Sequence, residues 1–115
     1  MKYFSYMVWA MKRDLTETCY GFFHTLANPT RLAIMEKLRA GPMNVTAIAE
    51  ALNQEQSMIS HNLQPLERCR LILPERKGKE KLFRLNTETM EPIFKAVENH
   101  ADKHCQAKGH CSYSK

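Results

Sequence analysis

The sequence predicts one mainly α-helical domain with a small β-hairpin, in the order α-α-α-α-β-β-α. Apolar residues recur at helical spacing through most of the 115-residue chain. Two short helical segments, 46–52 and 54–69, are separated by a turn of almost no length. A charged turn around Gly78 then joins two short segments with strand character. The length is that of a single domain with its own core, so residues 1–115 are expected to form one unit.

The composition is that of a globular protein and indicates which class of molecule it binds. Hydrophobic residues make up 43% and charged residues 25% of the chain, and the formal net charge is +5. A small basic domain favours an anionic partner, with nucleic acid as the first candidate. No apolar run is long enough to cross a membrane, and the apolar segment 1–11 lacks a small-residue cleavage site. We therefore expect a cytoplasmic protein without a membrane partner, whose four cysteines are thiols.

The N-terminal part is expected to contain two helices. Residues 3–26 keep apolar side chains at helical spacing and contain no proline. Asn28 and Pro29 then mark a helix start, because asparagine can cap a free N–H and proline at the first helical position loses no hydrogen bond. The glycine and proline at 41 and 42 are expected to end this second helix.

The next two helices are short and nearly contiguous. Asn44 is expected to cap helix 46–52, whose apolar side chains face inward. Asn53 is expected to cap helix 54–69, with Gln56 three residues later as its capping-box partner. This arrangement is typical of a helix-turn-helix.

The remainder of the chain is expected to form a hairpin and a last helix. Pro65 removes a backbone hydrogen bond and is expected to kink helix 54–69 or to end its regular part early. Short strands are expected at 71–74 and 81–85, followed by a helix over approximately 87–108. A helix-turn-helix followed by a basic hairpin is a winged helix-turn-helix.

The second helix of this motif has the side chains expected for reading DNA. Its outer positions carry few acids and many short or planar hydrogen-bonding groups, which suit base edges and phosphates in a major groove. The hairpin tip adds cations that could hold the phosphate backbone. Each feature alone is also typical of an ordinary solvated surface, and only their combination in this order predicts DNA binding. The candidate DNA-binding residues are Gln54, Gln56, Ser57, Met58, Ser60, His61, Gln64, Arg68, Arg76, Lys77 and Lys79.

Three segments also carry a family resemblance. Residues 26–34 resemble the L-A-x-P-x-R-L-x-I opening of the ArsR/SmtB family of bacterial and archaeal repressors. Residues 45–52 resemble the family's first DNA-domain helix, and residues 56–63 resemble its Q-S-x-V-S-x-H-L recognition helix. The resemblance implies a homodimer built from the first and last helices, approximately 3–26 and 87–108. It also implies binding to a double-stranded DNA operator that is relieved by a metal, metalloid or oxidant.

The chain departs from the family pattern at three places. Asn62 stands where the family usually has histidine, and Cys69 with Arg70 stands where alanine and glycine usually close the recognition helix. Helix 46–52 contains no cysteine, which excludes the arsenic or lead site of the C-x-C type. Cys69 is expected to fill the small buried alanine position, because free cysteine behaves as a small apolar residue.

The C-terminal end concentrates groups that bind soft metals. Thiolate and imidazole ligands suit Zn(II), Cd(II), Cu(I) or As(III) and suit Mg(II) poorly. The candidate ligands are Cys105, Cys111, His104 and His110, with Cys19, His100, Asp102 and Cys69 as further candidates. The spacing is not that of a standard zinc motif. A dithiol switch involving Cys105, or a polar tail with no sensor role, would explain the same residues.

The sequence therefore favours a dimeric transcriptional repressor with a soft-metal or thiol sensor. One alternative is a winged-helix DNA-binding regulator without a metal sensor, and another is a metal-handling protein that does not bind DNA. An enzyme is not expected, because the chain has no glycine-rich phosphate loop and no credibly spaced Ser/His/Asp arrangement.

Overall fold

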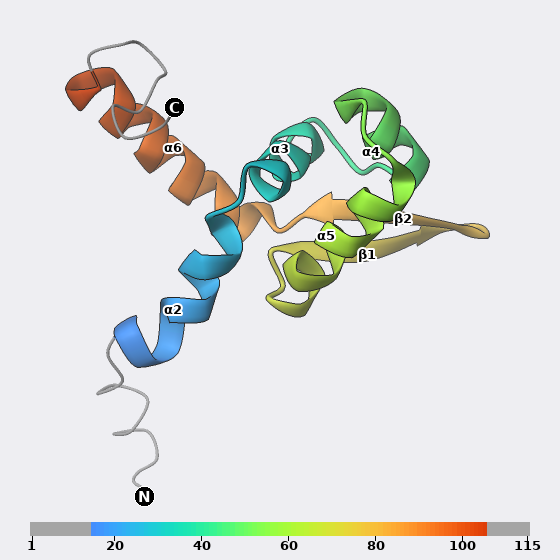
Figure 1. Cartoon of the computed structure of the whole chain (residues 1–115), viewed down its shortest axis with the longest axis horizontal. Coiled ribbons are helices and arrows are strands. Elements are labelled where there is room, and N and C mark those ends of the chain that lie inside the picture. Colours follow the sequence, from blue (N-terminus) through green and yellow to red (C-terminus); the bar gives the residue numbers. More distant parts are fainter. Residues whose placement is uncertain (1–14, 106–115) are drawn as a thin grey trace, which may run out of the picture.

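The computed structural model describes residues 15–105, with side chains from Tyr20 onward, and confirms the predicted element order. The helices and strands, labelled as in Figure 1, are α2 (Leu15–Leu26), α3 (Pro29–Leu38), α4 (Val45–Leu52), α5 (Gln56–Arg68), β1 (Ile72–Lys77), β2 (Glu80–Leu85) and α6 (Thr87–His104). The predicted limits 3–14 and 106–108 of the first and last helices lie outside the described residues. In the described part of the chain, no helix is long and apolar enough to cross a membrane.

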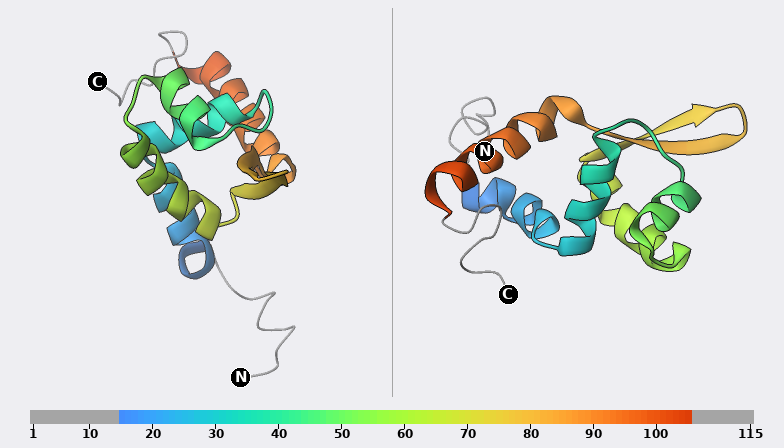
Figure 2. Two further views of the ribbon diagram at one scale, coloured as in Figure 1. Left: turned by 90° about the vertical axis from the view of Figure 1, so that its right-hand side faces the viewer. Right: turned by 90° about the horizontal axis from the view of Figure 1, so that it is seen from above.

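The elements separate into two ends of the molecule. Helices α3, α4 and α5 pack together, with α5 lying across the base of the hairpin, and the hairpin projects away from them as a wing (Figure 1). Helices α2 and α6 extend from the opposite end, away from the wing tip, as Figure 2 shows from above. We call α3–α5 with the hairpin the reading end, and α2 with α6 the α2/α6 end.

The apolar core belongs almost wholly to the reading end. Helical spacing places one face of each of α3, α4 and α5 inward, and the base of the hairpin closes the cluster. Only one fully buried core residue, Met90, comes from α6. The core consists of Ile34, Met35, Leu38, Ile48, Ala49, Ile59, Leu63, Leu66, Leu71, Ile72, Phe83, Leu85 and Met90.

Two of the three predicted asparagine caps are confirmed and one is wrong. The Oδ1 atoms of Asn28 and Asn44 accept hydrogen bonds from backbone N–H groups inside α3 and α4, at 3.0 and 2.8 Å. Asn53 does not cap α5; it ends α4 in the left-handed conformation with φ of 55°. The tight turn needs a residue that tolerates positive φ, and asparagine does so better than most. Helix α5 therefore begins two residues later than predicted, and no capping box forms because the N-cap residue is Glu55.

Pro65 does not end α5, which continues to Arg68. Proline at this position removes the hydrogen bond to the carbonyl of His61, and its ring crowds that carbonyl, but the helix tolerates both effects. His61 is exposed, so water can hydrate that carbonyl. The prediction of an early end is therefore wrong.

The hairpin is longer than predicted. Its strands pair in register from Ile72 with Leu85 to Lys77 with Glu80, and the turn is only Gly78 and Lys79. Gly78 has φ of 64°, which a two-residue hairpin turn requires. The charged residues that suggested a loop instead form a solvated ladder, because strand pairing uses only the backbone.

The end of α5 closes with a residue in an unusual conformation. The N–H of Leu71 donates to the carbonyl of Leu66 at 2.9 Å, and the N–H of Arg70 donates to Glu67 at 3.0 Å. This pattern resembles a Schellman cap, whose left-handed residue is usually glycine. Arg70 occupies that position with φ of 60°. A side chain in this region costs about 1 kcal/mol.

Candidate nucleic-acid interface and sensor region

The outer face of α5 collects most of the predicted DNA-binding side chains. Ile59, Leu63 and Leu66 turn inward to the core, which leaves the intervening positions in solvent. Met58 is 46% exposed although it is apolar. Gln54 lies in the turn before α5 and not on the helix itself. The exposed set on α5 is Gln56, Ser57, Met58, Ser60, His61, Gln64 and Arg68.

The wing brings the predicted cations to its tip. Arg76 and Lys77 are exposed at the end of β1, and Lys79 is exposed in the two-residue turn itself. Arg76 donates from Nη1 to the carbonyl of Lys79 at 3.3 Å, which holds its stem along the turn. The side chain of Asn44, at the start of α4, donates to Glu80 on β2. The wing is therefore attached to the helix-turn-helix by a side-chain contact as well as by the chain.

A buried polar junction behind α5 was missed by the sequence analysis. Asn62 is only 8% exposed, and its Oδ1 accepts a hydrogen bond from Nε of Arg31 at 3.2 Å. Arg31 also donates from Nη1 to the carbonyl of Thr25 at 3.3 Å. One guanidinium on α3 thereby connects the end of α2 to the middle of the recognition helix. The available signal was a polar residue at an inward position of α5, between Ile59 and Leu66.

Cys69 also lies at this junction, contrary to the expectation that it would be buried. The residue is exposed, and its Sγ lies 3.5 Å from Oγ1 of the buried Thr25. It follows the last turn of α5, where the helix end leaves one side of the side chain open to solvent. Cys69 therefore does not replace a buried alanine.

The predicted metal ligands are only partly described. His100 and His104 share one exposed face of α6 with ring centroids 5.0 Å apart, and Cys105 follows as the C-cap residue. Asp102, which lies between the two histidines in the sequence, is exposed. Among the side chains that the structure describes, no three His, Cys, Asp or Glu residues come together as a metal site. His110, Cys111 and the side chain of Cys19 lie outside the described residues.

An apolar groove opens between α2, α3 and α6. It has a volume of about 400 Å³ and is lined mainly by Phe23, Leu26, Leu32, Phe94 and Val97. Phe23 and Val97 on its rim are 55% and 59% exposed, and Tyr20 on α2 is 68% exposed. Such a contiguous apolar surface is typical of a protein–protein contact.

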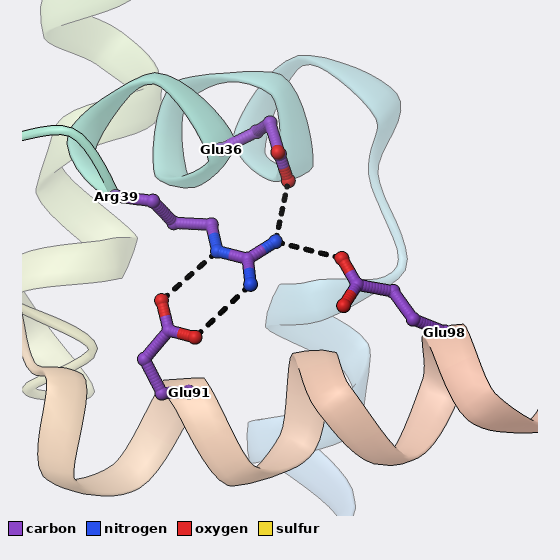
Figure 3. Close-up of polar contacts among 4 residues, drawn as sticks. All are labelled: Glu36, Arg39, Glu91 and Glu98. Carbon is purple, nitrogen blue, oxygen red and sulfur yellow. Dashed lines mark hydrogen bonds and ion pairs between the residues drawn. The ribbon is translucent and has the colours of Figure 1, made fainter.

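A charged cluster fastens α6 to the reading end (Figure 3). Arg39, just after α3, forms a bidentate pair with Glu91 at 2.9 and 3.0 Å and reaches Glu98 at 2.8 Å. Glu36 lies 3.4 Å away, and the Phe94 ring lies 5.0 Å below the guanidinium carbon. The hydrogen bonds from Arg39 lower the pKa of Glu91 below its usual value. The bidentate pair therefore keeps Arg39 and Glu91 charged, and the cluster fixes α6 relative to the end of α3.

Comparisons with known proteins agree with this architecture. Residues 28–72 match the family model described as bacterial regulatory protein, arsR family. The chain is 38% identical over 73 residues to the HTH-type transcriptional regulator NmtR of Mycobacterium tuberculosis, covering 63% of this chain but only 61% of NmtR. It is 32% identical over 81 residues to the transcriptional repressor SdpR of Bacillus subtilis, covering 70% of this chain and 90% of SdpR.

A solved structure extends the likeness to three dimensions. The homodimeric winged helix-turn-helix DNA-binding domain of a Mycobacterium bovis protein superposes with a TM-score of 0.72 at 31% sequence identity. The superposition covers 84% of this chain and 89% of that one.

Proposed function

The chain belongs to the arsR family of bacterial regulatory proteins, and we propose that it is a homodimeric transcriptional repressor that binds a double-stranded DNA operator. We propose further that a soft metal or metalloid ion, or thiol oxidation, relieves this binding at Cys and His residues of α6 and the C-terminal tail. The family consists of regulatory proteins, in keeping with the expectation that the chain is not an enzyme.

The observation that carries the DNA-binding proposal is the division of α5 into two faces. Its inner face is anchored by fully buried apolar residues, so the helix is held rigidly on the domain. Its outer face presents amides, hydroxyls and an imidazole with no acidic side chain among the exposed set. These groups can donate to and accept from base edges in a major groove. The wing cations supply contacts to the phosphate backbone on the same side of the motif.

The apolar groove supports the homodimer. A second copy that brought its own α2 and α6 against this surface would cover the exposed rings and Val97 in both protomers. The solved relative from Mycobacterium bovis is homodimeric. Two recognition helices in such a dimer must lie about 34 Å apart to enter successive major grooves.

Residues at the end of α6 support the proposal of a metal sensor. His100 and His104 already lie within reach of one ion, and Cys105 follows them immediately. His110 and Cys111 follow five and six residues after Cys105 in the sequence and could complete a soft-metal site. An ion held there would change the packing of α6 against its partner. Arg39 would pass that change to α3, and the half-site spacing would no longer fit the operator. A coupling free energy of about 1–3 kcal/mol would suffice for release.

The test combines operator binding with ion titration. A duplex enriched from a random library by the reduced protein should be released by Zn(II), Cd(II), Cu(I) or As(III), each added alone, with thiolate charge-transfer absorbance rising in parallel. Replacing Cys105 and Cys111 by Ser should abolish release while binding persists. Release that survives both changes would remove the sensor proposal.

The wing has a separate test within the same assay. Replacing Lys77 and Lys79 by Ala should weaken binding to selected and unrelated duplexes alike and reduce its salt dependence. A change in sequence preference alone would contradict the phosphate role.

A second candidate function is a DNA-binding regulator without a metal sensor. It is favoured by the exposure of His100 and His104, which is also typical of an ordinary solvated helix face. In that case the duplex would bind as above, but none of the four ions would release it.

A further inference from the structure

We infer that Arg70, together with Arg68, contacts the DNA phosphate backbone at the C-terminal end of α5 and forms a second basic anchor distinct from the wing. This inference rests on the proposed DNA-binding function and names two of the residues through which that function acts. Arg70 carries it, because three independent features of this residue lead to the same conclusion.

The first feature is the backbone conformation. Arg70 and Asn53 are the only non-glycine residues with positive φ in the described chain. Asparagine tolerates this region, whereas a long side chain is disfavoured there and glycine is the usual choice at this cap position. The cap hydrogen bonds involve only backbone atoms, so glycine would make them equally well. An arginine in this strained position indicates that its side chain has a functional role.

The second feature is that the guanidinium of Arg70 has no partner among the residues that the structure describes. Among the arginines whose side chains the structure describes, four are engaged within the protein. Arg31 donates a hydrogen bond to Asn62, and Arg39 forms ion pairs with three glutamates. Arg76 donates to a carbonyl of its own turn, and Arg84 forms an ion pair with Glu75 at 3.5 Å. Arg68 and Arg70 make no side-chain hydrogen bond or ion pair with any described residue, and both are exposed. Their planar donor groups are available for an external anion.

The third feature is where the two arginines lie. They line one shallow hollow together with Gln64, which belongs to the exposed face of α5, and Glu67. The polar face of the recognition helix is therefore continuous with this basic end.

The position relative to the wing favours DNA as the anion. The C-terminal end of α5 leads into the base of the hairpin, and the wing cations lie at its far tip (Figure 1). A six-residue strand separates the two basic groups by about 20 Å. A major groove is about 12 Å wide, so cations at this separation can reach the phosphates that border it on both sides. Arginine binds phosphate and carboxylate oxygens alike in a bidentate manner, so what favours phosphate is the place of Arg70 beside the exposed face of α5 and not the guanidinium itself.

The experiment measures binding and stability on the same Arg70→Gly variant. The probes are a duplex enriched from a random library by the wild-type protein and a scrambled duplex of equal length. We expect binding to weaken about tenfold on both duplexes, with the salt slope falling by about 0.9 for each protomer. The midpoint of thermal unfolding should rise by about 2–5 °C, because the strain is relieved. Arg70→Lys should lose less binding than Arg70→Gly and keep the wild-type salt slope, because the charge remains although the paired contact to phosphate is lost.

A matched control separates a local contact from net charge. Lys37→Ala removes one exposed cation from α3 and should leave the salt slope unchanged. Unchanged binding by Arg70→Gly would overturn the inference, as would a lower unfolding midpoint or a loss seen only as weaker dimerisation in sedimentation. A wild-type protein that enriches no duplex would overturn the proposed function itself, whereas binding by the wild type with no effect at Arg70 would overturn only this inference.

Discussion

The two ends of the molecule bury their side chains in opposite ways. The reading end encloses nearly all of the fully buried apolar residues and exposes a polar face. The α2/α6 end leaves aromatic and aliphatic side chains around an open groove. It is held to the core by the buried Met90 and by polar contacts at Arg31 and Arg39. One end is therefore complete within a single chain, and the other leaves an apolar surface that the proposed second copy would cover. A regulator benefits from this division, because the reading surface stays rigid while the α2/α6 end can change its packing.

The largest expected effect comes from truncating one aliphatic side chain at each end and comparing the losses of stability. Leu66 is fully buried at the centre of the reading end, and Val97 is 59% exposed on α6. Leu66→Ala should reduce the free energy of unfolding by about 2–5 kcal/mol, because it leaves a cavity. Val97→Ala should have a smaller effect, confined to the dimer. Urea unfolding at several protein concentrations measures both, and equal losses would show that the two ends are not distinct.

The next largest effect is expected on dimer formation, from a substitution in the apolar groove between α2, α3 and α6. Phe23→Glu places a charge on the rim where a second copy is proposed to pack, and burying two unpaired charges in a symmetric dimer should cost about 3 kcal/mol or more. Sedimentation should then show monomers that retain the helical circular dichroism of the wild type. Glu88→Gln, at an exposed position at the start of α6, serves as the control and should leave the dimer intact. A dimer that survives the Phe23 change would place the interface elsewhere.

The junction at Arg31 sharpens the comparison by linking the two ends. Asn62→Ala leaves Nε of Arg31 without its partner, which should cost about 1–3 kcal/mol. Arg31→Ala should cost a similar amount, and the double variant should cost less than the sum of the two, because the same contact is lost. Chemical denaturation of the four proteins tests this. Strict additivity would mean that the hydrogen bond contributes nothing to stability.

The smallest expected effect is the pH dependence of the Arg39 cluster. The pKa of Glu91 is lowered in the folded protein by Arg39, so its contribution is present above the usual value of 4.5 and is lost as pH falls below it. The contribution is modest, because the pair is partly in solvent and is screened. Thermal unfolding between pH 3 and 7 should show a smaller acid loss for Glu91→Gln than for the wild type. Identical pH profiles would show that the pair does not stabilise the fold.

Much of the reading end could be predicted from the sequence because its signals are local. The alternation of apolar and polar positions in α4 and α5, the asparagine caps at 28 and 44, and the glycine at the wing tip each act within a few residues. The exposed face of α5 followed from the same periodicity. The limits of the hairpin were missed because charged side chains obscure a pairing that depends on backbone groups alone.

The sequence by itself determined the order of elements, the inward faces of the short helices and the residues offered to solvent on α5, because helical periodicity encodes all three. Only the tertiary structure decided which distant polar groups meet. Arg31 reaches Asn62, and Arg39 reaches Glu91, across 31 and 52 positions of sequence, and no local pattern specifies such pairs. Likewise, only the folded chain distinguishes Arg68 and Arg70, which have no partner among the described residues, from the other described arginines, which each have one. Long-range contacts depend on how the packed core orients each helix, and that orientation is a property of the whole fold.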